Sequence, residues 1–292
     1  MATKQVNETS GFTLAEGATH VGIFHNIGGT LHRFVESFTH VGIFHITRRV
    51  AFTLAEVLIT LGIIGIVSAM TIPTLINNYK EKVRDNQFKK VYATLNQALR
   101  MTISDYDYIP KCYYPDTGTG AVKAECIDFY EKFRNKLRLS KICLDNSYTQ
   151  GCIPSYKGVE IVMKENHQND PDYDEEYWEN VAMNQASGWS TNNLKRLSTS
   201  LVLSDSSIII IYNNSTATNP SYFPLFLVDI NGSKGPNKWG HDLFDIAINL
   251  KSETNMFELV GNNRPVEEGG IQTTALIQKL FGVHIIRTGI SK

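Results

Sequence analysis

Glu56 is the residue whose position in the chain most clearly calls for a specific chemistry. It stands at the N-terminal edge of the run Val57–Ile76, which is 20 residues long and carries no charge. A carboxylate in lipid costs about 2.5–3.5 kcal/mol on insertion scales, so such a group usually has a partner. No Lys or Arg lies between Val50 and Tyr79. Cleavage before Phe52 would create an ammonium group four residues from the carboxylate, and a neighbouring chain could present the same group.

The run that follows Glu56 has the length of a membrane span. At about 1.5 Å per residue, a helix of that length covers roughly 30 Å, the thickness of the hydrocarbon core of a bilayer. A signal-peptide core is the rival interpretation, but such cores usually have about 7–15 residues. Pro73 removes one backbone hydrogen bond and should bend the helix. If Glu56 instead sits among the lipid headgroups, it needs no partner.

The sequence Phe52-Thr-Leu-Ala-Glu56, followed by an apolar run with Pro73 late in it, resembles the prepilin cleavage and methylation segment of type IV pilins and type II secretion pseudopilins. The resemblance covers about 25 to 30 residues. It implies that a prepilin peptidase cuts before Phe52 and methylates the new amine. It also implies that Glu56 pairs with the amine of an adjacent subunit in a filament. Ala51 departs from the family, which almost always has Gly before the cut.

Residues 1–51 form a leader that contains a repeat of 20 residues. The segment His20–His25 recurs at positions 40–45, and Phe12-Thr-Leu-Ala-Glu16 recurs at positions 52–56. An in-frame insertion of residues 12–51 explains both the long leader and Ala51, because its removal joins Gly11 to Phe52. The histidines of this leader could bind metal, but duplication explains them as well and cleavage would discard them. An insertion that silences the gene product is a further hypothesis.

Four cysteines lie beyond the apolar run, within a window of 41 residues: Cys112, Cys126, Cys143 and Cys152. An even, clustered set is typical of disulfides in an oxidising compartment. Three pairings are open, of which we expect the local one, Cys112 with Cys126 and Cys143 with Cys152. A zinc site is disfavoured because no C-x-x-C pair is present.

The cysteines and the flanking charges disagree about orientation. Arg48 and Arg49 precede the apolar run, whereas five cations follow it closely: Lys80, Lys82, Arg84, Lys89 and Lys90. The positive-inside rule would therefore place the C-terminal part in the cytoplasm. The cysteines and the family resemblance favour the outside, and long domains cross largely regardless of flanking charge. We expect a single-pass protein of the bacterial inner membrane with residues 105–292 in the periplasm or outside the cell.

Hydrophobic periodicity indicates the elements that position these residues. Beyond the apolar run, Phe88, Val91, Tyr92, Leu95, Ala98 and Leu99 form one apolar face. We therefore expect one membrane and stalk helix over 52–104. The predicted elements of the remaining domain are a loop at 106–124, helices at 127–139, 172–189 and 271–281, and strands at 157–164, 200–203, 207–212, 222–230, 244–250 and 256–260, with a hairpin about Asp205-Ser206.

This pattern predicts an α+β fold in which the stalk helix packs on four or five antiparallel strands, with extra short helices and loops. That arrangement is also what the pilin resemblance implies. A short apolar tail, 283–286, follows the last helix.

The loop from Asp229 to Asp245 is the most distinctive stretch of the soluble part, rich in Gly, Asn and Asp. Calcium prefers six to eight oxygen ligands of this kind. The loop loosely resembles the C-terminal loop of major pseudopilins, where calcium is bound. If calcium binds here, Asp229, Asn231 and Asp242 are the expected ligands. The alternative is that Asn, Gly and Pro form tight turns that the Asp side chains cap.

Composition and motifs narrow the classes of function. The chain has 292 residues and a net charge of -1, which gives no argument for nucleic-acid binding. It lacks a G-x-S-x-G turn, an H-E-x-x-H motif and a phosphate-binding glycine loop. We therefore expect that the chain is not an enzyme and requires no cofactor. We expect it to be a structural subunit of a type IV pilus or type II secretion pseudopilus. The alternative is an unprocessed, membrane-tethered, extracytoplasmic binding protein.

Overall fold

The computed structural model describes residues 53–282, apart from 109, 111, 113–119, 187, 214–224 and 252–255. The predicted leader 1–51, with Ala51, and also Phe52 and the tail 283–286, lie outside the described residues. The chain divides into two compact units, Met1–Ile66 and Val67–Lys292, and the boundary falls inside the first described helix.

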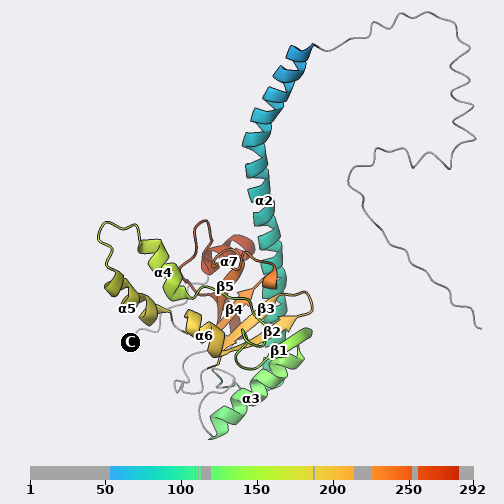
Figure 1. Ribbon diagram of the computed structural model, residues 1–292. Helices are drawn as coiled ribbons and strands as arrows, with labels where there is room; N and C mark the ends of the chain where they lie inside the picture. Colours follow the sequence, from blue (N-terminus) through green and yellow to red (C-terminus); the bar gives the residue numbers. More distant parts are fainter. Residues whose placement is uncertain are drawn as a thin grey trace, which may run out of the picture. The chain divides into compact units, whose positions relative to one another are not determined.

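That helix, α2, spans Leu54–Ile103 and has 50 residues (Figure 1). Its C-terminal end lies within one residue of the predicted end of the stalk. In the first unit, every described residue of α2 is exposed. In the second unit, the predicted apolar face is confirmed, because α2 buries Phe88, Val91, Leu95, Ala98, Leu99 and Thr102.

Six antiparallel strands form one sheet in the order β1-β2-β3-β4-β5-β6. The strands are β1 Leu139–Cys143, β2 Ser198–Leu203, β3 Ile208–Tyr212, β4 Leu225–Asp229, β5 Leu243–Lys251 and β6 Met256–Gly261. The predicted hairpin about Asp205-Ser206 is confirmed, because Val202 pairs with Ile208 across it. Ser206 has a φ of 74°, and the Asp205 Oδ1 accepts a hydrogen bond from the Ser207 N–H at 3.1 Å.

Both faces of this sheet are buried. Strand residues alternate between faces, so Ile209 and Ile211 of β3 enter one core while Ile208 and Ile210 enter the other. The first core is closed by α2, α3 (Gly120–Asn135) and α7 (Thr273–Phe281). The second core is closed by α4 (Val159–His167), α5 (Glu175–Gln185) and α6 (Thr191–Arg196). The α+β prediction is confirmed, with six strands where four or five were expected and with helices on both faces.

Two predictions of local structure were wrong, and two elements were not predicted. Residues 157–164 are not a strand, because Val159, Val162 and Met163 instead form the buried face of α4. Helix α3 begins at Gly120, inside the predicted loop, and β1 and α6 were not predicted. Short apolar runs fit both periods, so packing partners decide between helix and strand. Strand β1 is an edge strand with exposed Ser140 and Lys141, which hid its pattern.

One of the two expected disulfides is formed in the structure. Cys143 and Cys152 are bonded across nine positions of the sequence. Cys112 and Cys126 carry thiols in the structure, and the second disulfide stays a prediction. Both are buried, and their side chains are hydrogen-bond partners. Burial raises the pKa of the Cys112 thiol, which favours its neutral form.

Replacing Cys143 and Cys152 together with Ser should lower the free energy of unfolding by about 2–4 kcal/mol, because the bond restricts the unfolded chain. Urea unfolding of the full chain in detergent measures this change. Reduced wild-type protein is the control and should unfold close to the variant. A peptide map prepared without reductant that links Cys143 to Cys112 or Cys126 would contradict the observed pairing.

Candidate functional site

The N-terminal end of α2 carries a reciprocal cap that involves Glu56. The Glu56 Oε2 accepts hydrogen bonds from the Thr53 N–H at 2.8 Å and from the Thr53 Oγ1 at 2.9 Å. In return, the Glu56 N–H donates to the Thr53 Oγ1 at 3.2 Å. This is a capping box, in which residues three apart satisfy backbone donors that a helix end leaves without partners. This cap was not predicted from the sequence, although Thr53-Leu-Ala-Glu56 before an apolar run matches the residue pattern of a capping box.

The cap gives the Glu56 carboxylate a hydrogen-bond partner in its own chain, but that partner is neutral. Within the described part of the chain, Glu56 forms no ion pair, and no described group donates to its Oε1. The Oε2 of Glu56 therefore accepts hydrogen bonds from Thr53. Among the described residues nothing neutralises the charge or donates to Oε1, so a cation from outside these residues could bind there.

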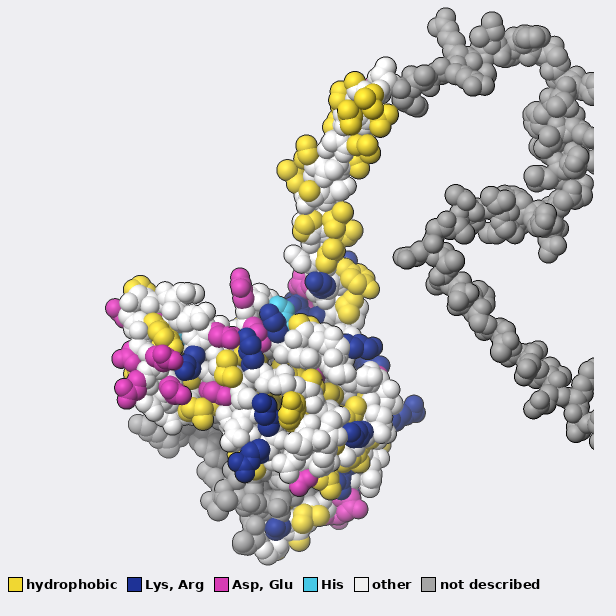
Figure 2. Space-filling view, viewed as in Figure 1, with side chains coloured by type: hydrophobic (Ala, Val, Ile, Leu, Met, Phe, Trp, Pro, Cys, Tyr) yellow, Lys and Arg dark blue, Asp and Glu magenta, His cyan; other side chains and the backbone are white. Residues whose placement is uncertain are grey.

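The apolar run predicted to cross a membrane is helical throughout. Of the described helices, α2 is the one long and apolar enough to span a bilayer, and its most apolar 18-residue window is not buried by other parts of the protein. The exposed side chains include Leu58, Ile63, Ile66, Met70 and Leu75. Figure 2 shows hydrophobic side chains along this part of the helix. Pro73 lies inside α2 rather than at its end.

An ion-pair cluster that sequence reasoning missed fixes the helix just beyond the apolar run. Lys279 of α7 contacts Glu81 and also Asp85 of α2, the latter with Nζ and Oδ2 2.8 Å apart. The Arg84 Nη2 lies 2.9 Å from the Asp85 Oδ1. These groups are partly exposed, so each pair contributes little to stability by itself. Their effect is positional, because they tie α7 to α2 where α2 joins the domain.

The three predicted calcium ligands lie at the end of β4 and in the loop that follows it: Asp229 is the last residue of β4, and Asn231 and Asp242 belong to the loop. Asp229 is fully buried. Its Oδ1 accepts from the N–H groups of Asn231 (3.1 Å) and Gly232 (2.7 Å), and its Oδ2 accepts from the Tyr156 hydroxyl at 2.7 Å. Tyr156 lies 73 positions earlier in the chain, so no local pattern could have revealed this contact. Asp229 thus caps the turn that opens the loop.

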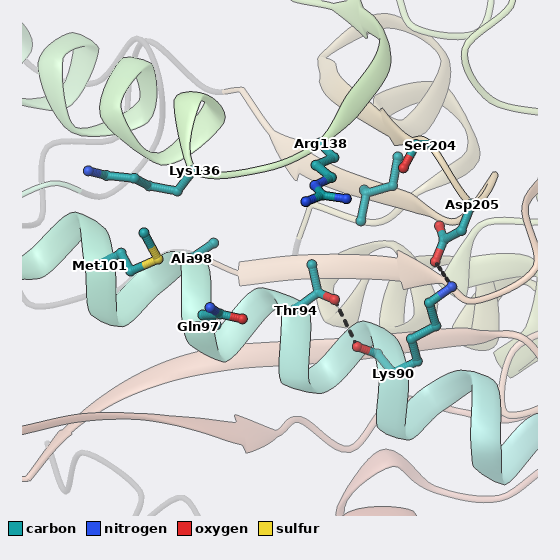
Figure 3. A pocket seen from close by; sticks show the side chains of 10 residues that line it. Lys90, Thr94, Gln97, Ala98, Met101, Lys136, Arg138, Ser204 and Asp205 are labelled. Carbon is teal, nitrogen blue, oxygen red and sulfur yellow. Dashed lines mark hydrogen bonds and ion pairs between the residues drawn. The ribbon is translucent and has the colours of Figure 1, made fainter.

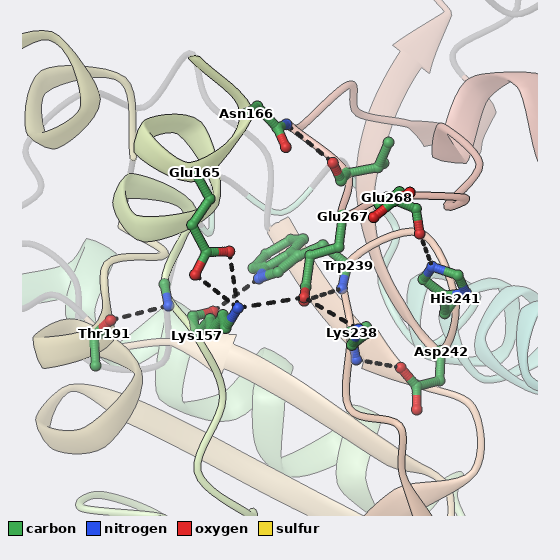
Figure 4. A network of polar contacts seen from close by, with 12 residues as sticks. Lys157, Glu165, Asn166, Thr191, Lys238, Trp239, His241, Asp242, Glu267 and Glu268 are labelled. Atoms are coloured by element: carbon green, nitrogen blue, oxygen red, sulfur yellow. Dashed lines mark hydrogen bonds and ion pairs between the residues drawn. The ribbon is translucent and has the colours of Figure 1, made fainter. Parts of the chain in front are cut away.

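Asp242 closes the same loop in the same way. It accepts from the N–H groups of Asn237 and Lys238, each at 2.6 Å. Its neighbour His241 points elsewhere, since the Nε2 of His241 lies 2.9 Å from the Glu268 carbonyl oxygen (Figure 4). His241 and Asp242 therefore do not form a catalytic dyad with each other.

A buried acid, Glu267, holds the loop against the rest of the domain. Its Oε1 accepts from the Trp239 N–H at 3.3 Å, and its Oε2 lies 3.6 Å from the Lys157 Nζ. The indole N–H of Trp239 donates to the Lys157 carbonyl oxygen at 2.8 Å. Figure 4 shows Lys157 between Glu165 and Glu267. The network positions the loop by joining it to α4 and to the chain that follows β6.

The donor set of this loop fits calcium in part. Asp229 and Asp242 already accept hydrogen bonds from backbone N–H groups, as the turn-capping alternative expects. Among the described residues, however, nothing donates to the buried amide oxygens of Asn231 and Asn237. Oxygens of this kind are ligands that calcium accepts. The described residues include no group of three or more His, Cys, Asp or Glu side chains that could hold a metal. Calcium binding stays a prediction.

Burial raises the pKa of Asp229 to about 7, from an ordinary value of 3.8, and the nearby charge of Asp242 adds to the rise. Burial also raises the pKa of Asp242. Between about pH 4 and 7 the folded chain therefore holds a proton on Asp229 that the unfolded chain has released. The stability that this proton gives is fully present below about pH 4 and is lost as the pH rises through 7.

Replacing Asp229 with Asn should make the midpoint of urea unfolding less dependent on pH between 4 and 7, because Asn cannot ionise and can still cap the turn. Unfolding of the full chain in detergent at several pH values measures this, with the exposed Asp107→Asn as control. Equal pH slopes for wild type and Asp229→Asn would contradict the assignment.

Calcium, if it binds, should stabilise the wild type more at pH 7 than at pH 5, because it favours the ionised carboxylate.

Comparisons of the chain with family models, with curated proteins and with solved structures each find no match. Its function is therefore inferred from the residues of this chain and from their geometry.

Proposed function

We propose that the chain is a prepilin-like subunit of a type IV pilus or a type II secretion pseudopilus. The observation that carries this proposal is the division of α2 into two parts. The first part is capped and exposed and carries no charge between Val57 and Ile76, so it could lie in a membrane. The second part has one apolar face, which packs on an antiparallel sheet. The Phe52-to-Glu56 sequence at the start of the helix supplies the specific resemblance.

In this proposal a prepilin peptidase cuts before Phe52 and methylates the new amine. The cut places a cation directly before Thr53, the cap of α2. The Oε1 of Glu56, to which no described group donates, would then accept that ammonium from an adjacent subunit. A site with little water strengthens the attraction between the two charges. Thr53 would keep the carboxylate in position without neutralising it.

The role of such a subunit is mechanical. Addition and removal of subunits at the inner membrane extend or retract a fibre, and the domain at residues 105–292 lies on its surface. The subunit's partners are other pilin or pseudopilin subunits and the peptidase.

One sequence observation favours the alternative of an unprocessed, membrane-tethered binding protein. Ala51, rather than Gly, precedes the cleavage position. In that case the membrane helix would anchor the domain while the chain keeps its leader. The two proposals predict different N-termini.

Protein extracted from membranes should begin at Phe52 with a methylated amine, because the peptidase acts before assembly. Mass spectrometry of the N-terminal peptide measures this. Replacing Ala51 with Gly should increase the processed fraction, since Gly is the residue that the family has there. Detection of intact Met1 alone, in both proteins, would favour the tethered alternative.

Replacing Glu56 with Gln should leave insertion and processing intact but abolish incorporation into filaments. Gln can keep the capping box, since the motif accepts Glu or Gln, but it carries no charge. Thr53→Val is the matched control, because it removes the cap and keeps the carboxylate. Filament yield and membrane content of both variants measure the difference. If Glu56→Gln assembles like the wild type, the ion-pair mechanism is wrong.

A further inference from the structure

A groove lies along the domain part of α2, between that helix, the start of β1 and the turn that joins β2 to β3. Its volume is about 500 Å³. Its lining residues come from these three places: Lys90, Thr94, Gln97, Ala98, Met101, Lys136, Arg138, Leu203, Ser204 and Asp205. Figure 3 shows these side chains around the groove.

The polar rim of the groove is basic. The Lys90 Nζ lies 2.8 Å from the Asp205 Oδ2, and the Lys136 Nζ lies 2.7 Å from an oxygen of Asp105. The third cation, Arg138, is exposed and forms no ion pair with another described residue. In Figure 3 its guanidinium points into the groove. A guanidinium of this kind suits a carboxylate, which it can bind through two parallel hydrogen bonds.

The floor of the groove is apolar. Ala98 and Leu203 are buried beneath it, and Met101 is 43% exposed. Methionine adapts its shape to different apolar partners, which is useful at a binding surface. The groove therefore fits an apolar side chain whose neighbouring residues carry carboxylates.

Lipid headgroups do not fit the position of this groove. Lys90 follows Ile76, the end of the apolar run, by 14 residues (90 − 76), and the other α2 residues of the groove lie further along. At about 1.5 Å per residue, Lys90 is about 21 Å along the helix from the end of the run. An occupant would therefore come from the space beside the domain, where other subunits lie under the proposed function.

Helix α5 of the same chain presents the matching surface. Glu176, Glu179 and Met183 are spaced at i, i+3 and i+7, so they share one face of the helix, and all three are exposed. Neither glutamate forms an ion pair with another described residue. Figure 2 shows acidic side chains gathered over the α4–α5 part of the domain. We call Glu176, Glu179 and Met183 the acidic face of α5.

The groove and the acidic face lie on opposite sides of the sheet. Helix α2 packs on the core that contains Ile209, whereas Ala182 of α5 belongs to the core that contains Ile208. One copy therefore cannot bring its own acidic face to its own groove. A contact between two different patches of identical subunits repeats head to tail and builds an open assembly unless it closes into a ring.

We propose that the groove of one subunit binds the acidic face of α5 of a second copy of this chain. Met183 enters above Met101, and Glu176 and Glu179 meet Arg138 at the rim. This inference rests on the proposed function in one respect, since a repeated contact between domains is of use to a fibre. It names the partner surface, which the membrane helix alone does not specify.

Photo-crosslinking of the full chain in membranes tests the contact directly. Replacing Met101 with p-benzoylphenylalanine places a photoreactive group on the floor of the groove. Irradiation should give a crosslinked dimer, and mass spectrometry should map the crosslink to the segment Glu175–Gln185 of the second copy. A crosslink to another segment, a crosslink to a different protein, or no crosslink overturns the proposal.

Charge exchange supplies the second arm of the test. Arg138→Glu alone, and Glu176→Lys with Glu179→Lys, should each lower the dimer yield about three- to fivefold, the effect expected of exposed ion pairs. Combining all three changes should restore it. Arg100→Glu, an exposed reversal on α2 outside the groove, is the control and should leave the yield unchanged. Failure of the combined variant to recover overturns the charge pairing.

The outcomes separate this inference from the proposed function. If filaments form and contain the chain but the crosslink maps elsewhere, the subunit assignment stands and the groove contact is wrong. If the crosslink reaches α5 but the chain keeps Met1 and never enters a filament, the groove contact stands and the pilin assignment is wrong.

Discussion

The structure depends on one constraint: α2 must fit two different surroundings along its length. The first part of α2 is apolar on all sides, a composition that suits surroundings of lipid or of other apolar helices. Its later part has a single apolar face, which the sheet covers. Phe88 illustrates the change, since its ring packs edge-on against Phe244 of β5 with centroids 5.0 Å apart. Lys279 then holds α7 against α2 near the point where the two parts meet.

The sheet can carry this helix because both of its faces are covered. An antiparallel sheet often leaves one face to water, but here β3 is Ile-Ile-Ile-Ile-Tyr and needs two cores. Helices α4, α5 and α6 close the second core. That second layer also gives the domain a surface on the side of the sheet away from α2. The acidic face of α5 lies on this added layer, and the loop from Asp229 to Asp242 is held against it through Tyr156 and Glu267.

Sequence reasoning succeeded where a pattern is long and one-sided. The stripe from Phe88 to Leu99 indicates a helix by its period. The run Ile208–Ile211 indicates a strand by its β-branched composition and by the turn residues on either side of it. It failed at Val159–Met163, where alternation and helical spacing both fit, and at β1, whose exposed edge carries Ser140 and Lys141. The sequence suggests Asp229 as a calcium ligand because its carboxylate supplies oxygens. Its actual bond to Tyr156 spans 73 positions and depends on the fold. No pattern within one segment could have shown that Arg138 and Met101 line the same groove.

Under the proposed function, the capping box lets Glu56 serve a single chain first and an assembly afterwards. Before assembly, the Thr53 N–H and hydroxyl give the carboxylate neutral donors, and α2 begins in an orderly way. These bonds engage one carboxylate oxygen and leave the charge unpaired within the described chain. A carboxylate that is positioned but not neutralised loses little freedom when a cation arrives, so more of the attraction remains as binding energy. The same geometry that begins the helix thus prepares its charged end for a partner.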